Sequence, residues 1–212
     1  MTFSRLAALA ALTVLGAAPA GAQSDATTEF IVRRGKDTLA IERFSRDAAT
    51  LTGNIAQSNG GKFEYVANLR GDNTVEHVEL QRTAPNGNSA TMSVDFADTL
   101  VKATVMSGAQ TQSLSVGTLQ KPLPFLLISF ALCEQIVKAS HPEVGKPVKW
   151  MAVRLGAGDT ASMTVTRVSA DSVTISVPQG DVRLAVSAAG DVVGGQFPPQ
   201  QILVERKKAT AP

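Results

Sequence analysis

Apolar and polar residues alternate along most of the chain between residues 28 and 116, and clusters of turn residues interrupt the alternation. In the segment KFEYVANLR at 62–70 every second residue is apolar, so one face of a strand would be buried and the other would face water. Short turns such as PNGN at 85–88 favour hairpins, so neighbouring strands are expected to be antiparallel and to form a β-meander. The strands expected in this region are 28–34, 38–46, 49–57, 62–70, 74–83, 90–96, 100–106 and 110–116.

The alternation ends at Pro122 and Pro124, and the stretch LPFLLISFALCEQIVKASH that includes Pro124 is the most apolar after residue 22. Two prolines are expected to stop the sheet, with Pro124 in the first turn of a helix. Apolar residues then recur at helical spacing until Pro142 ends the pattern. The apolar run is well short of the ~20 residues that a membrane-spanning helix needs. The pattern predicts a central helix at about 122–140, buried on nearly all sides in its first half.

Alternating segments return after the helix and continue almost to the end of the chain. They lie at 146–155, 161–168, 172–177, 181–187, 192–194 and 201–206. We therefore expect a mainly β fold, in which a long antiparallel meander forms a curved half-barrel or barrel around one central helix. Residues 23–212 are expected to form a single β-rich domain.

The first 22 residues have the layout of a secretory signal peptide. Arg5 precedes an apolar run at 6–18, and small residues at Ala20 and Ala22 suit cleavage before Gln23. The run is too short to span a bilayer comfortably, so no transmembrane anchor is expected after cleavage. The predicted location is the periplasm or the exterior of the cell.

Composition narrows the function classes. A formal net charge of +2 offers no concentrated basic face, which argues against a nucleic-acid binder. The basic run at 206–208 is interpreted as a solubilising tail. A single cysteine, Cys133, excludes an internal disulfide and is expected to be a buried apolar residue.

The residues that usually carry chemistry are few and scattered. His77 and His141 have no metal-ligand spacing with Cys133, and the chain has no phosphate-binding loop or nucleophile motif. No catalytic residue, metal site or cofactor is therefore predicted. Glu42 and Glu79 are expected to face solvent on their strands.

The order of elements resembles the periplasmic lipoprotein-carrier half-barrels, the LolA- and LppX-like group. The opening segment FIVRRGKDTLAIERFSR, with Glu42 and Phe44 on its second strand, is also similar to uncharacterised exported bacterial β-domains. The resemblance implies that the concave apolar face holds lipid or acyl chains, and it implies no catalysis. The sequence shows no cluster of inward-pointing basic residues, so a head-group site is not expected.

These observations favour an exported, non-catalytic binding protein that holds a lipid or another apolar small molecule in the concave face of its sheet. One alternative is a structural or interaction module whose helix fills the concavity, so that the wall residues are ordinary core. The other is a hydrolase with a dispersed site, in which a serine or carboxylate would lie against a histidine inside a pocket. Protein partners are not predicted. The residues expected to form the apolar wall or lid are Phe125, Ile128, Leu132, Ile136, Trp150 and Tyr65.

Overall fold

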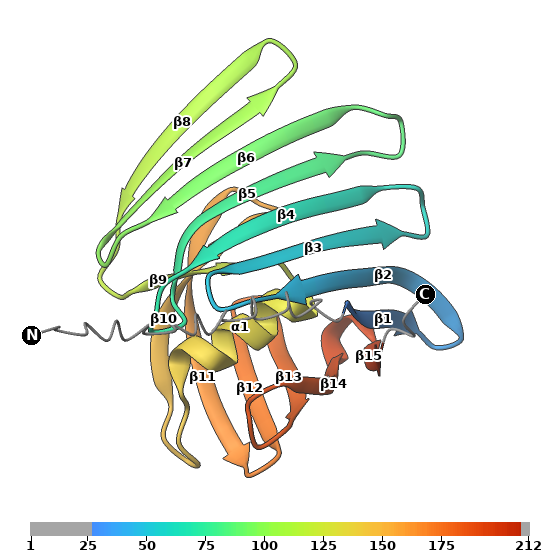
Figure 1. The fold of residues 1–212 in the computed structure, drawn as a ribbon, viewed down its shortest axis with the longest axis vertical. Coiled ribbons are helices and arrows are strands. Elements are labelled where there is room, and N and C mark those ends of the chain that lie inside the picture. The colour runs from blue at the N-terminus through green and yellow to red at the C-terminus, as the bar shows by residue number, and fades with distance from the viewer. Residues whose placement is uncertain (1–26, 209–212) are drawn as a thin grey trace, which may run out of the picture.

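Within the described residues, one curved sheet of 15 strands forms most of the structure, and one α-helix lies inside its curve (Figure 1). The structure, a computed structural model, describes residues 27–208. The strands are β1 (Thr28–Arg34), β2 (Asp37–Arg46), β3 (Thr50–Gln57), β4 (Lys62–Leu69), β5 (Val75–Thr83), β6 (Ser89–Phe96), β7 (Leu100–Ser107), β8 (Gln110–Gly117), β9 (Pro122–Phe125), β10 (Val148–Arg154), β11 (Asp159–Ser169), β12 (Ser172–Val177), β13 (Gly180–Val186), β14 (Val192–Phe197) and β15 (Ile202–Lys208). The helix is α1 (Phe130–Ser140), and a short 3-10 helix, η1 (Pro198–Gln200), precedes β15.

The sheet is a long meander whose two halves join through its first and last strands. Its order is β8-β7-β6-β5-β4-β3-β2-β1-β15-β14-β13-β12-β11-β10-β9. All pairs are antiparallel except β9 with β10. Burial alternates strictly along β4, because one of its faces packs on the core and the other meets solvent. The mainly β fold and the antiparallel meander are confirmed.

The predicted helix start is wrong. Residues 122–125 form strand β9, which pairs in parallel with β10 through bonds such as Leu155 N–H to the Phe125 carbonyl at 3.0 Å. Proline is tolerated in a strand at the edge of a sheet, because its missing N–H removes no bond from the single neighbour. The helix begins only at Phe130, after Ser129 accepts a hydrogen bond from Leu132 N–H as the N-cap residue.

The helix fills the middle of the concavity, and every residue of it is buried except Lys138. It packs against β2, β9 and β14. It ends at His141, which adopts a left-handed conformation with φ 40° and donates its N–H to the Val137 carbonyl. Among the described residues, no helix has both the length and the apolar character needed to cross a membrane.

The two free edges of the sheet, β8 and β9, do not pair with each other, so the barrel stays open. The β9 end instead tucks towards the inner face of the other half, where β9 contacts β5. Lys121, just before β9, places its Nζ 3.9 Å from Asp72 and 3.7 Å from Asp98. The expected half-barrel describes this arrangement well. The predicted signal peptide at 1–22 lies outside the described residues.

Candidate functional site

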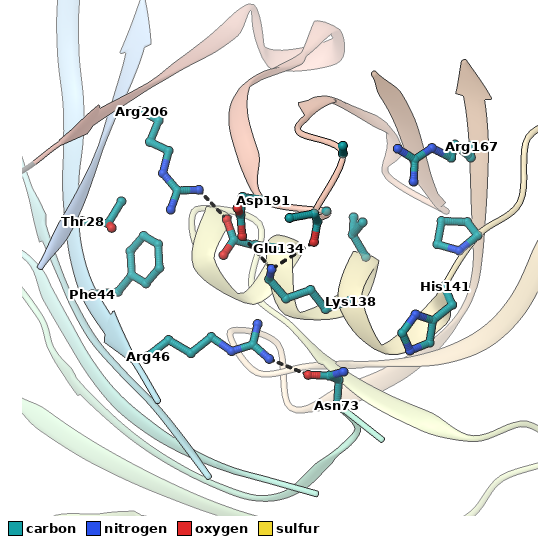
Figure 2. Close-up of a pocket in the computed structure, with 15 residues that line it drawn as sticks. Thr28, Phe44, Arg46, Asn73, Glu134, Lys138, His141, Arg167, Asp191 and Arg206 are labelled. Atoms are coloured by element: carbon teal, nitrogen blue, oxygen red, sulfur yellow. Dashed lines mark hydrogen bonds and ion pairs between the residues drawn. The ribbon is translucent and has the colours of Figure 1, made fainter. Parts of the chain in front are cut away.

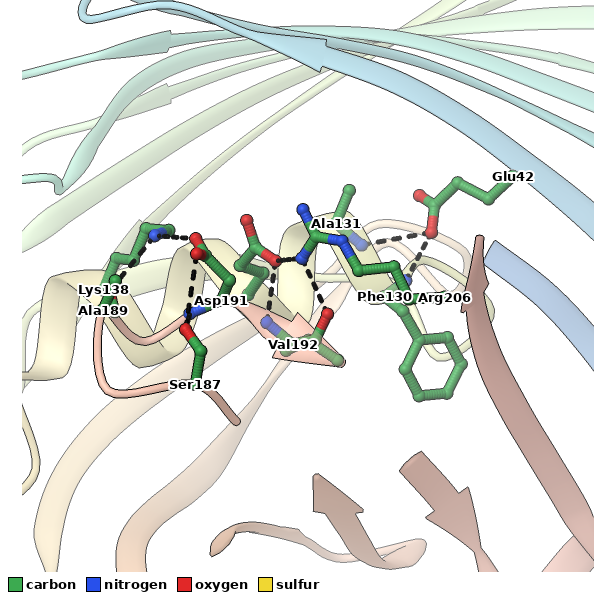
Figure 3. Close-up of polar contacts among 10 residues, drawn as sticks. Glu42, Phe130, Ala131, Lys138, Ser187, Ala189, Asp191, Val192 and Arg206 are labelled. Carbon is green, nitrogen blue, oxygen red and sulfur yellow. Dashed lines mark hydrogen bonds and ion pairs between the residues drawn. The ribbon is translucent and has the colours of Figure 1, made fainter. Parts of the chain in front are cut away.

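A buried carboxylate on β2 fixes the start of α1. Glu42 Oε2 accepts hydrogen bonds from the backbone N–H groups of Phe130, at 2.6 Å, and Ala131, at 3.1 Å (Figure 3). Its Oε1 accepts from Tyr65 Oη at 2.7 Å and from Ser129 Oγ at 2.5 Å. The carboxylate thus satisfies N–H groups that a helix start leaves unpaired and lies at the positive end of the helix dipole.

The expectation that Glu42 faces solvent is wrong, because its side chain is fully buried. It shares the inner face of β2 with Ala40 and Phe44, as the two-residue period of a strand requires. Burial raises the pKa of Glu42, and its four hydrogen-bond donors only partly offset that rise. Glu79, by contrast, is exposed as expected.

The six predicted wall residues lie in one place, the packed interior around α1. Phe125, Leu132, Ile136, Trp150 and Tyr65 belong to the main hydrophobic core, and Ile128 is half-buried against it. Of the six, only Tyr65 borders either of the two pockets of about 500 Å³ described for the chain. Contact of these residues with a ligand stays a prediction.

A polar pocket of about 510 Å³ opens at the C-terminal end of α1 (Figure 2). Its walls come from the ends of β1, β2, β11 and β15, the turns before β5 and β14, and the last turns of the helix. The lining residues are Thr28, Phe44, Arg46, Asn73, Glu134, Val137, Lys138, His141, Pro142, Arg167, Ala188, Ala189, Gly190, Asp191 and Arg206. This pocket corrects the expectation that no inward-pointing basic residues cluster in the fold.

Two ion pairs tie the helix to the border of this pocket, one to β15 and one to the turn before β14 (Figure 3). Arg206 Nη1 donates to Glu134 Oε2 at 2.7 Å, and that oxygen also accepts from Val192 N–H at 2.8 Å. Lys138 Nζ donates to Asp191 Oδ1 at 2.6 Å. The interpretation of Arg206 as part of a solubilising tail is wrong, because β15 carries it inward over the rings of Phe30 and Phe44.

Burial and charge shift the pKa values of these groups in opposite directions. Burial raises the pKa of Glu134, and Arg206 partly offsets the rise. The hydrogen bond from Lys138 holds the pKa of Asp191 below its ordinary value of 3.8. Burial lowers the pKa of Arg46, although Glu134 and Asp191 nearby favour its charged form.

Replacement of Asp191 by asparagine is expected to lower the free energy of unfolding by about 1 kcal/mol at pH 7, since it removes one partly exposed ion pair. Because the folded-state pKa of Asp191 is depressed, its contribution is present above the unfolded-state pKa and is lost as the pH falls through the folded one. The difference between the wild type and Asp191→Asn should therefore shrink below about pH 4. Urea titrations at pH 7 and pH 3 measure it, with Asp37→Asn at an exposed position as the control. A difference that is equal at both pH values would contradict the assignment.

An apolar seam runs along the inner face of β6–β8, away from the helix. Met92 and Ala103 are half-buried there, and Leu114 is 48% exposed. They face Val153 of β10 and Gly158 of the turn that follows it, and the gap between the two sides has a volume of about 10 Å³. That is roughly the space of one water molecule. The seam is where the two ends of the sheet meet without strand pairing.

The structure shows the surroundings of the His77 and Cys133 side chains. No group of three or more His, Cys, Asp or Glu side chains within the described residues could hold a metal ion. His77 Nδ1 lies 2.7 Å from Asp95 Oδ1, but the Asp95 side chain is 69% exposed on an open face of the sheet. Cys133 is fully buried, and burial raises the pKa of its thiol well above the ordinary value.

Comparison with solved structures relates the fold to one protein. The chain is similar to a DUF1089 family protein from Pseudomonas aeruginosa. The TM-score is 0.57 and the identity 12%, over 76% of this chain and 91% of that one. At this identity the similarity shows the fold alone. No protein-family model and no curated protein matches the chain, and the resemblance to the lipoprotein carriers stays a prediction.

Proposed function

We propose that the protein is an exported, non-catalytic binding protein whose ligand is a lipid or a similar molecule with an apolar chain. The apolar chain of this ligand would enter the seam between β6–β8 and the β10–β11 hairpin. The observation that carries this proposal is the apolar inner surface of β7 and β8, where Leu114 stays 48% exposed inside the curve of an open sheet. Apolar surface of this kind is costly in water and favours an apolar occupant.

The lack of strand pairing across the seam supports a ligand site that can open. Strands β8 and β9 are the free edges of the sheet, so the two ends can separate without breaking a strand ladder. The gap has a volume of only about 10 Å³ and is lined mostly by apolar side chains such as Val101 and Val116, with Asp159 and Thr160 at its border. Binding would therefore push the hairpin and the β7–β8 end apart, and the ligand would replace contacts that the two ends now make with each other.

Export rests on the sequence of residues 1–22. The N-terminal sequence of protein recovered from the periplasm or culture medium of an exporting bacterial host tests it directly. A mature chain that begins at Gln23 would support the proposal, and retention of Met1 would contradict it.

Replacement of Leu114 by aspartate is expected to remove most of the lipid that co-purifies with the protein, at least a tenfold loss, because a charge in the seam excludes an acyl chain. The matched control is Met106→Asp. Met106 lies on the neighbouring strand β7 and is also 48% exposed, but its side chain is on the opposite face of the sheet from Leu114. Native mass spectrometry and lipid extraction of detergent-free samples give the measurement. Equal lipid content in the two variants would contradict the seam as the site.

A second candidate function is an interaction module with no ligand, as the buried state of α1 favours. An unliganded mass for the wild type, with no extractable lipid, would support this candidate and overturn the first. The exposed edge strand β8, which has no proline or charged residue, would then be the first surface to test for a protein partner.

A further inference from the structure

The pocket at the end of α1 carries more positive than negative charge. Four cationic side chains border it, from four different elements: Arg46, Lys138, Arg167 and Arg206. Two carboxylates, Glu134 and Asp191, face them. The excess of two positive charges matches the charge of about −2 that a phosphate monoester carries at neutral pH.

Both carboxylates already have cationic partners. Glu134 is bound by Arg206 and by the N–H of Val192, and Asp191 is bound by Lys138. These contacts, 2.6 to 2.8 Å long, have the length of charge-assisted hydrogen bonds. The pairs account for two of the four cations and leave the guanidinium groups of Arg46 and Arg167.

The two remaining guanidinium groups donate their hydrogen bonds to neutral acceptors. Arg46 Nη2 donates to Asn73 Oδ1 at 2.6 Å, and Asn73 is held in a turn with φ 63° (Figure 2). Arg167 donates to the backbone carbonyls of Ser169 and Ala170. Arg46 is half-buried, and burial lowers its pKa although the nearby carboxylates of Glu134 and Asp191 favour its charged form. Neither carboxylate is hydrogen-bonded to Arg46, and an anion in the pocket would be a charged partner in direct contact.

The size and the fixed base of the pocket also suit a small ligand. Its volume of about 510 Å³ lies in the range of small-molecule sites. The base of the pocket is fixed, because Gln135 of α1 donates to the Asn73 carbonyl at 2.5 Å and so ties the turn that orients Arg46 to the helix. A guanidinium held in this way can donate two parallel hydrogen bonds to an oxyanion with little loss of side-chain freedom.

We propose that this pocket binds a phosphate-type oxyanion, with Arg46 as its main ligand and Lys138, Arg167 and Arg206 as supporting positive charges. The site lies outside the apolar seam, so it stands whether or not the seam holds an acyl chain. The oxyanion is either a free phosphate compound or the head group of the lipid proposed above, in which case the inference rests on that function.

Isothermal titration calorimetry of the folded protein with inorganic phosphate and with dihexanoyl phosphatidic acid tests the proposal. For whichever probe binds, Arg46→Gln is expected to raise the Kd at least tenfold. Added NaCl should also weaken binding of that probe to the wild type. Arg82→Gln is the control, because Arg82 is exposed on β5 and does not border the pocket. If Arg46→Gln fails to fold, Arg167→Gln on β11 provides the same test from another wall.

The two probes separate the two sources of the anion. Binding of inorganic phosphate that depends on Arg46 indicates a free phosphate compound, and binding of the lipid alone indicates a head group. Loss of lipid binding in Leu114→Asp but not in Arg46→Gln would exclude the lipid head group as the source of the anion and keep the seam, whereas the reverse result would keep the site and overturn the seam. If the wild type binds neither probe, or Arg46→Gln binds as tightly as the wild type, the proposal is wrong.

Discussion

Replacement of Glu42 by alanine is expected to lower the free energy of unfolding by roughly 3–5 kcal/mol. The change leaves the Tyr65 hydroxyl and the N–H groups of Phe130 and Ala131 without an acceptor in a fully buried place. Each unpaired buried donor costs about 1–3 kcal/mol. The helix that fills the concavity would lose its connection to β2.

Urea unfolding, followed by the fluorescence of Trp150, measures the loss. Trp150 is the only tryptophan of the chain and lies in the core, so its emission reports on the packing around α1. Glu64→Ala is the matched control, because Glu64 is exposed on β4 and should change the free energy of unfolding by less than about 0.5 kcal/mol. Equal losses in the two variants would show that Glu42 does not fix the start of the helix.

Replacement of Gly53 by alanine is expected to lower the free energy of unfolding by about 2–3 kcal/mol. Gly53 pairs with Tyr65 across β3 and β4, and the tyrosine ring lies over it. A Cβ at this position would come within 2.3 Å of the Cζ and Oη atoms of Tyr65. The ring cannot move aside freely, because its hydroxyl is bonded to Glu42 and its side chain is buried.

Two further variants separate this clash from a general effect of alanine. Gly71→Ala should be nearly neutral, because Gly71 has open space around its Cα and no positive φ. In a Tyr65→Ala background, Gly53→Ala should cost much less than in the wild type, since the two positions are in contact and their effects are not additive. Chemical denaturation of the wild type, the two single variants and the double variant completes this double-mutant cycle. An unchanged cost in the Tyr65→Ala background would rule out the ring as the cause.

The strand boundaries were predictable because they depend on local signals. Alternation and turn residues placed β1 and β12 correctly at both ends, and most other strands to within two residues. The helix start was missed because the sequence alone suggests that Pro122 and Pro124 end the sheet. Their tolerance depends on β9 lying at an edge, and strand order is a long-range property.

It was harder to predict on which face of the sheet a charged residue lies than to predict the strand that carries it. Alternation placed Glu42 on the same face as Ala40 and Phe44, which would have been a usable signal. A carboxylate is normally assigned to solvent, however, because burial is costly without partners. Three of its four partners are at the start of α1, 87 or more positions away, and only folding brings them to β2.

The basic pocket had no sequence signature for the same reason. Its cationic residues are spread from Arg46 to Arg206, and no spacing rule connects them. The sequence by itself determined the alternating strands, the turns, the single central helix and the absence of a disulfide, because these follow from neighbouring residues and composition. Only the tertiary structure decided that the sheet stays open and that a carboxylate caps the helix. It also brought four cations together at the helix end, because contacts between distant strands depend on strand order and register.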